Sequence, residues 1–136
     1  MTDISEKAVI ASDRLPAAKE VLALFRRLNW AKMELRDPAR FDAALECSWP
    51  VVTAWSDGRL VGICRCITDG EYTAYICDLA VDPEFQGNGL GSTLVTTALE
   101  MLEGYDTIAL MTSVARVEFW EKFGFSNIPG GMILYR

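Results

Sequence analysis

A glycine-rich turn is the part of this sequence whose residue types point most directly to chemistry. Three alternating glycines, Gly87, Gly89 and Gly91, follow Gln86 and lead into an apolar helical pattern. The first amides of a helix have no partners within it, and the helix dipole adds partial positive charge there. Glycines leave those amides open to a ligand and permit positive φ. The turn is therefore expected to bind an anion, usually a phosphate; the alternative is that the glycines serve only the geometry of the turn.

Two common phosphate-binding patterns do not fit this turn. A P-loop ends in Gly-Lys followed by Ser or Thr, and no such sequence ends this one. The dinucleotide pattern GxGxxG also fails, because its third glycine, counted from Gly87, falls on Ser92. A different nucleotide-binding protein is therefore a disfavoured alternative.

The composition narrows the reaction chemistry. The chain contains no histidine, which excludes Ser–His–Asp and Cys–His nucleophile pairs. The formal net charge of -6 argues against nucleic acid as the main partner and fits, weakly, a cationic substrate such as an amine. The cysteines form no CxxC pair, so reduced, buried thiols are expected instead of a metal site; they are Cys47, Cys64, Cys66 and Cys77.

Length and hydropathy indicate a single domain over residues 1–136 with its own core. No run of about 18 apolar residues appears, so no membrane span is expected. The N-terminal residues MTDISEKAVI lack the apolar stretch of a secretory signal. The sequence therefore predicts a cytoplasmic protein.

The elements that must position the turn follow from the periodicity of the apolar residues. Together they predict an α+β, or mixed α/β, domain in which a three-stranded antiparallel meander precedes the turn. The expected strands are Lys7–Ala11, Pro50–Trp55, Arg59–Ile67, Tyr72–Val81, Thr107–Met111 and a final one at Met132–Tyr135. The expected helices are Leu15–Trp30, one opened by Asp37-Pro38, one that follows the glycine turn, and Val114–Phe123.

The turn and the strand before it resemble motifs of the GNAT acetyltransferases. The spacing Gln86-x-x-Gly89-x-Gly91 is similar to the family's pyrophosphate-binding motif, and Leu79–Pro83 is similar to the strand end that precedes it. Further segments resemble the family's late helix, its hairpin between the second and third strands, and its small-amine branch: Val117–Phe125, Asp57–Gly62 and Arg65–Gly70. The resemblance implies a GNAT-type fold with a twisted, mostly antiparallel sheet of six to seven strands flanked by about four helices.

The resemblance also implies a reaction. A primary amine of a small molecule would attack acetyl-CoA directly, through a tetrahedral intermediate and with no metal. The strand Leu79–Val81 would pair with the pantetheine arm, and the amide of Leu79 or Ala80 would face the thioester carbonyl. The cofactor-binding residues implied in this way are Leu79, Ala80, Val81, Gln86, Gly87, Asn88, Gly89, Leu90, Gly91, Ser92, Ser113 and Trp120.

The candidate catalytic residues, Tyr75, Asp78 and Trp120, depart from the family pattern. Tyr75 stands where relatives carry an acidic or imidazole group. Asp78 and Glu71 are the nearby carboxylates, but strand alternation puts Asp78 on the opposite face from Tyr75 unless a bulge intervenes. Asp78 as an ordinary sheet residue is the alternative, so the base is unassigned.

Trp120 stands where the family has the tyrosine that protonates the departing thiolate. An indole offers only an N–H donor, so Trp120 is expected to wall the cofactor slot or to donate a hydrogen bond to sulfur. Ser113 stands where relatives often have an asparagine. These departures keep open an alternative function, an acyl-CoA-binding or interaction module with little catalysis. The sequence neither supports nor excludes a homodimer.

Overall fold

The computed structural model describes residues 8–136, so Lys7 of the expected first strand lies outside the described residues. Within that range five strands form one sheet in the order β1-β2-β3-β4-β5. Neighbouring strands are antiparallel except for β5, which runs parallel to β4. The strands are β1 Val9–Ala11, β2 Val51–Ser56, β3 Arg59–Thr68, β4 Thr73–Val81 and β5 Thr107–Leu110.

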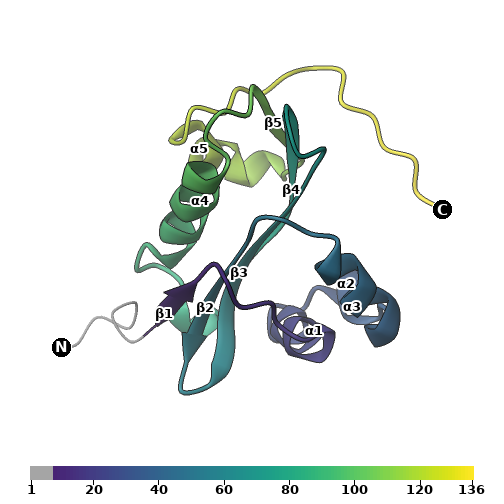
Figure 1. The fold of residues 1–136 in the computed structure, drawn as a ribbon, viewed down its shortest axis with the longest axis vertical. Helices are drawn as coiled ribbons and strands as arrows, with labels where there is room; N and C mark the ends of the chain where they lie inside the picture. Colours follow the sequence, from purple (N-terminus) through teal and green to yellow (C-terminus); the bar gives the residue numbers. More distant parts are fainter. Residues whose placement is uncertain (1–7) are drawn as a thin grey trace.

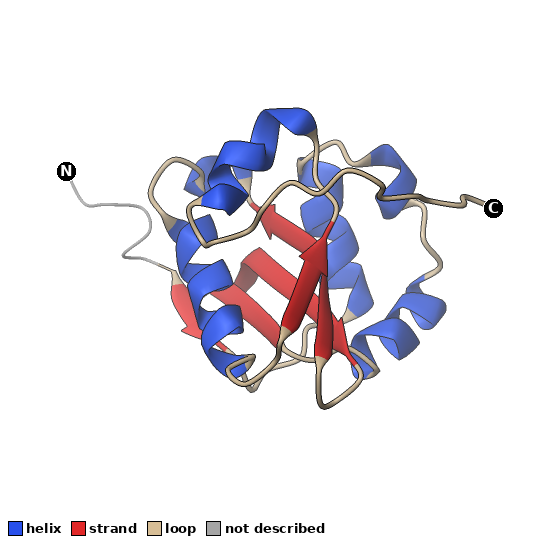
Figure 2. Ribbon diagram, turned by 90° about the horizontal axis from the view of Figure 1, so that it is seen from above, coloured by secondary structure: helices blue, strands red, loops and turns tan. Residues whose placement is uncertain are grey.

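Helices cover both faces of this sheet (Figures 1 and 2). One group packs on the first face and comprises α1 Ala18–Arg27, α2 Ala31–Glu34 and α3 Pro38–Glu46. The other group packs on the second face and comprises α4 Leu90–Met101 and α5 Val117–Glu121. Short 3₁₀ turns precede α4 and α5, at η2 Pro83–Phe85 and η3 Val114–Arg116. The α+β prediction is confirmed.

Two apolar cores result from this arrangement. Phe25, Leu45 and Ile63 belong to the core between the sheet and helices α1 and α3. Leu94 and Cys64 belong to the core between the sheet and α4. Because β3 and β4 are central strands covered on both faces, the polar side chains that they bury need partners within the protein.

Two local predictions are confirmed by backbone geometry. Asp37 caps α3, since its Oδ2 accepts a hydrogen bond from the amide of Arg40 at 3.0 Å, and Pro38 occupies the first turn. Asp57 and Gly58 both have positive φ (50° and 75°) and join β2 to β3 in a tight hairpin, as an Asp-Gly pair favours.

The expected helix Leu15–Trp30 is too long at both ends. Ala17 is extended and α1 begins only at Ala18. At the other end Asn29 adopts a left-handed conformation, with φ of 59°, which stops α1 and separates it from α2.

The final strand expected at Met132–Tyr135 is wrong. These residues lie within the described range and form no strand. Met132 and Leu134 are 93% and 77% exposed, so their side chains lack the packing that turns β propensity into a strand. Over residues 8–136 the sheet therefore has five strands, fewer than the six to seven expected, and β5 is an edge strand.

Candidate functional site

Strand β4 loses one of its two neighbours halfway along its length. Its pairing with β5 runs only from Thr73 to Ile76, whereas its pairing with β3 continues to Val81. Within residues 8–136 no strand pairs with this edge of β4 from Cys77 to Val81, and we call this stretch the open edge. An open edge presents unpaired amides and carbonyls to any extended ligand.

A β-bulge coincides with the point where β5 stops. Arg65 lies opposite Asp78, but Cys66 lies opposite Ile76, so Cys77 is an extra residue in β4. The side chain of Ile76 packs in the core beneath α4, whereas Asp78 contacts Arg65 on the opposite face. The bulge therefore reverses the alternation and places Asp78 on the same face as Tyr75, which simple alternation did not predict.

The ladder pattern tells which backbone groups face the open edge. Gly62 lies opposite Val81, and the amide of Asp82 donates to the carbonyl of Val61 at 2.8 Å. In an antiparallel ladder this makes Gly62 and Val81 a non-hydrogen-bonded pair, so Ala80 points its backbone groups toward β3. The N–H and C=O of Leu79 and Val81 consequently point to the open edge. Of the two amides expected to face the thioester, that of Leu79 points to the open edge and that of Ala80 points to β3.

The glycine turn continues this edge into helix α4. Gly87 and Gly89 both have φ of +83°, a conformation that favours glycine. The first i→i−4 bond of α4 runs from the amide of Thr93 to the carbonyl of Gly89 at 3.0 Å. The amides of Leu90, Gly91 and Ser92 precede that bond and have no partner within the helix.

The turn can offer an anion only backbone groups, because it has no cationic side chain of its own. From Cys66 to Ala115 the sequence contains neither Lys nor Arg. Asn88 donates through Nδ2 to the carbonyl of Gln86 at 3.4 Å, and Nε2 of Gln86 donates to the carbonyl of Val81 at 2.9 Å. These bonds occupy carbonyls and leave the amides at the start of α4 available.

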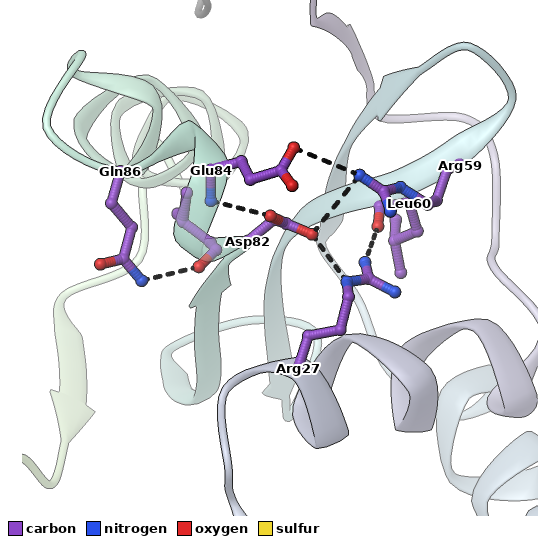
Figure 3. A network of polar contacts seen from close by, with 7 residues as sticks. Arg27, Arg59, Leu60, Asp82, Glu84 and Gln86 are labelled. Carbon is purple, nitrogen blue, oxygen red and sulfur yellow. Dashed lines mark hydrogen bonds and ion pairs between the residues drawn. The ribbon is translucent and has the colours of Figure 1, made fainter.

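A buried carboxylate connects the turn to the rest of the fold (Figure 3). Asp82 is only 2% exposed; its Oδ1 accepts from the amide of Glu84 at 2.9 Å and its Oδ2 from Nε of Arg27 at 2.7 Å. Arg27 also donates to the carbonyl of Leu60 at 2.7 Å. Nη2 of Arg59 lies 3.9 Å from Oδ2 of Asp82 and 3.9 Å from Oε2 of Glu84. Asp82 thus joins α1, β3 and η2. Sequence reasoning did not single it out, although the Asp-Pro pair was a signal for a capped turn.

Asp78, a candidate base, is engaged in a second buried ion pair. Its Oδ2 accepts from Nε of Arg65 at 2.6 Å, and both residues are buried. Arg65 also donates to Oγ of Ser48 at 3.1 Å, and Ser48 donates to the carbonyl of Ala44 at 2.7 Å. The carboxylate is therefore tied through β3 to the end of α3.

Tyr75 is not an ordinary base either. Burial raises the pKa of its phenol, and the neighbouring Cys77 thiol raises that pKa further. Tyr75 is therefore protonated near neutral pH and can donate a hydrogen bond. Burial also raises the pKa of Cys77, so this thiol is likewise protonated.

Trp120 and Ser113, two predicted cofactor-binding residues, lie in different surroundings. Trp120 is 7% exposed, and its ring makes edge-to-face contacts with Phe119 and Phe125 at centroid distances of 5.1 and 5.5 Å. This packing suits a wall. Ser113 is exposed and precedes η3 without capping it through its side chain. Phe119 also lies beside the turn, since a Cβ on Gly91 would be 3.9 Å from its ring.

None of the helices in residues 8–136 is both long enough and apolar enough to cross a membrane. Nor does this part of the chain gather three or more Cys, Asp or Glu side chains in a group that could hold a metal ion.

Sequence comparison relates the chain to acetyltransferases. The acetyltransferase (GNAT) family profile matches residues 17–125. Histone acetyltransferase TAP1 of Glycine max is 30% identical over 126 residues, which cover 83% of this chain and 53% of that protein. An uncharacterized ycf52-like N-acetyltransferase of Prochlorococcus marinus is 30% identical over 118 residues, covering 82% of this chain and 64% of that protein. The chain therefore spans less than two thirds of the length of these two relatives.

Solved structures share the fold at lower sequence identity. A GNAT family acetyltransferase from Streptococcus pneumoniae superposes with a TM-score of 0.78 at 24% identity, covering 95% of this chain and 98% of that one. An aminoglycoside acetyltransferase from an uncultured soil metagenomic sample, in complex with sisomicin, gives 0.73 at 21% identity, covering 98% and 97%. The profile match over most of the chain, on a fold shared with these structures, shows that the protein belongs to the acetyltransferase (GNAT) family.

Proposed function

We propose that the protein is an acetyl-CoA-dependent N-acetyltransferase that acetylates a primary amine of a small molecule. The observation that carries this proposal is the open edge of β4, which leads directly into the amides at the start of α4. CoA has an extended pantetheine arm with amide groups, followed by a pyrophosphate that joins the arm to an adenosine. The order of partners along the protein, strand edge and then helix N-terminus, matches the order of groups along CoA.

Different residues of this chain would bind different parts of CoA. The backbone of Leu79 and the amide of Val81 pair with the pantetheine arm in the manner of an added strand. The amides of Leu90, Gly91 and Ser92 hold the pyrophosphate, while Gly87, Gly89 and Asn88 shape the loop. Gln86 holds the carbonyl of Val81 and so keeps the turn against the strand end.

Acetyl-CoA supplies a thioester whose acyl carbon accepts the lone pair of the amine; the C–S bond breaks and CoA leaves as the thiol. The amide of Leu79 faces the place where the carbonyl oxygen gains negative charge. A preorganised donor of this kind is typically worth about 3–4 kcal/mol of barrier.

Removal of the proton from the amine falls to solvent in this proposal. Asp78 is tied to Arg65, and the raised pKa of Tyr75 keeps its phenol protonated. An amine with a pKa near 10.4 is neutral only about once in 10³ at neutral pH. The rate of acetyl transfer is therefore expected to rise with pH above 7.

Two observations bear on the class of the acceptor. The relatives named above include a histone acetyltransferase and an aminoglycoside acetyltransferase. Both names are compatible with an amine acceptor. The net charge of -6 favours a cationic one.

The second candidate is an acyl-CoA-binding module with little catalysis. Its specific support is that the candidate acid–base groups are paired, protonated or buried among aromatic rings.

Three further properties stay predictions. They are the cytoplasmic location, a single domain that extends over residues 1–136, and a homodimer.

One experiment separates these possibilities. Thermal stability is measured with CoA and acetyl-CoA, and thiol release is measured with polyamines, arylalkylamines, amino acids, aminoglycosides and a lysine peptide. Ligand at 100 times its Kd is expected to add roughly 2–3 kcal/mol. Stabilisation without thiol release favours the binding module. A lack of stabilisation by either ligand contradicts both candidates.

A further inference from the structure

We propose that Arg65 and Asp78 are positioning residues for acetyl transfer, because their ion pair fixes the peptide that carries the Leu79 amide. This inference rests on the proposed function. It gives Asp78 a role other than that of a base and assigns a role to Arg65, which the proposed function leaves without one.

The position of the pair in the sheet is the first support. Arg65 lies directly opposite Asp78, immediately beside the bulge that leaves Cys77 unmatched. Pairing with β5 ends at Ile76, so the backbone that follows has one neighbour instead of two. This is where the direction of β4 is least constrained by its ladder, and it is also where the Asp78–Leu79 peptide must present its N–H to the thioester.

The rigidity of the pair is the second support. Arg65 makes a 2.6 Å bond to Asp78 and a 3.1 Å bond to Ser48, and its guanidinium lies 5.5 Å from the ring centroid of Phe41. Ser48 is held in turn by the carbonyl of Ala44. The position of the Asp78 side chain is thus fixed relative to helix α3 and not only relative to the neighbouring strand.

Energetics supply the third support. A buried ion pair is often no more stable than two apolar side chains of similar volume, although loss of one partner is strongly destabilising. Stability alone is therefore a weak reason to bury two charges beside the first apolar core. A directional bond that sets one peptide plane at the point of reaction is a stronger one.

Two variants separate positioning from folding. Asp78→Asn removes one charge and is expected to lower the melting temperature. The double variant Arg65→Met with Asp78→Leu removes both charges and is expected to regain much of that stability. Thr53→Val is the matched control, because Thr53 lies in β2, which does not pair with β4. The substitution removes two hydrogen bonds, from Nε1 of Trp55 to Oγ1 at 2.8 Å and from Oγ1 to the carbonyl of Ala11 at 3.3 Å.

The readout is the carbonyl stretching frequency of [1-¹³C]acetyl-CoA bound to each protein, measured by isotope-edited infrared spectroscopy. It needs no acceptor amine. An amide that donates to the carbonyl lowers this frequency relative to free ligand. We expect the lowered frequency in the unaltered protein and in Thr53→Val, and a frequency near that of free ligand in both Asp78 variants. With an amine that supports turnover, kcat is expected to fall about 10- to 100-fold while the Kd for CoA changes little.

The outcomes are distinct. A double variant that regains stability together with the wild-type frequency and kcat shows a purely structural pair and overturns the inference. A frequency that moves equally in Thr53→Val does the same, because it then follows stability. Binding to the unaltered protein with no lowered frequency also overturns it, since the Leu79 amide would not face the carbonyl. Absence of any acetyl-CoA binding overturns the proposed function as well.

Discussion

Nε of Arg27 donates to Oδ2 of Asp82 at 2.7 Å and so joins the last turn of α1 to the residue that follows β4. The two residues are far apart in sequence, and the contact places a helix of the first core against the start of the glycine turn. Because Asp82 also caps η2, one carboxylate sets both the end of the strand and the entry to the turn.

Asp82→Asn tests this connection. A hydrogen bond to a charged group contributes about 1.5–3 kcal/mol, and we expect a loss of that order in the free energy of unfolding, with weaker CoA binding. Glu84→Gln is the control, because its side chain is 77% exposed and 3.9 Å from Arg59, and such pairs contribute about 0–1 kcal/mol. Chemical denaturation and calorimetric titration measure both quantities; equal effects of the two variants would contradict the assigned role.

Gly89→Asp tests the phosphate site. Gly89 and Gly104 both have positive φ, and a Cβ at either meets no atom within 4 Å. The two substitutions therefore carry similar backbone strain, but only Gly89 lies at the start of α4. Like charges 4 Å apart repel by about 1–4 kcal/mol, so we expect the Kd for CoA to rise at least tenfold in Gly89→Asp and to stay unchanged in Gly104→Asp. If both variants bind CoA like the unaltered protein, the glycines serve only the turn.

Trp120→Phe tests whether the indole acts on the sulfur. Packing against Phe119 and Phe125 predicts that a phenyl ring preserves the wall, so thiol release with an active amine is expected to stay near the wild-type rate. A hydrogen bond to the departing thiolate would be worth about 1.5–3 kcal/mol, and its loss would slow release about 10- to 100-fold. Trp120→Ala should cost about 3–5 kcal/mol of stability and serves as the packing control.

The turn between β3 and β4 predicts an acid-dependent contribution to stability. Hydrogen bonds donated by the backbone amides of Glu71, Thr73 and Tyr72 lower the pKa of Asp69 below its usual 3.8. Because this pKa is lower in the folded state, the Asp69 carboxylate stabilises the protein at a pH above the pKa that Asp69 has in the unfolded chain. The stabilisation is lost as the pH falls through the pKa that Asp69 has in the folded protein. Unfolding measured from pH 7 to pH 2 should show the difference between wild type and Asp69→Ala shrinking below about pH 4. A constant difference would contradict this assignment.

The cysteines should react with a thiol reagent in a fixed order. Cys47 is exposed and should be modified first. Burial raises the pKa of Cys77, so less thiolate is present and reaction is slower. The pKa of Cys64 is raised well above its usual value, mainly by a hydrogen bond with Cys66 and secondly by burial. This buried thiol should react only on unfolding. Peptide mass spectrometry of a time course at pH 8 gives the order, and early loss of Cys64 would contradict the described core.

Sequence patterns predicted the parts of this fold that local chemistry decides. The glycine turn, the Asp57-Gly58 hairpin and the Asp37 cap each depend on neighbours in the chain, and each is present. Membership of the family was also predictable, because its motifs lie in the same local segments.

Features decided by distant contacts were not predictable in this way. The bulge at Cys77 depends on register against β3, and it reverses the face on which Asp78 lies. The ion pairs of Asp78 and Asp82 depend on arginines from β3 and α1. The apolar pattern of Met132–Tyr135 suggested a strand, but strand formation needs a surface to pack against.

The half-paired state of β4 also bears on how the protein survives without its ligand. The backbone groups that we propose bind a pantetheine arm can also pair with another extended polypeptide, including the same segment of another copy. CoA bound along the open edge of β4 would therefore also block pairing between copies of the chain. A protein of this construction is expected to keep best in storage when CoA is added.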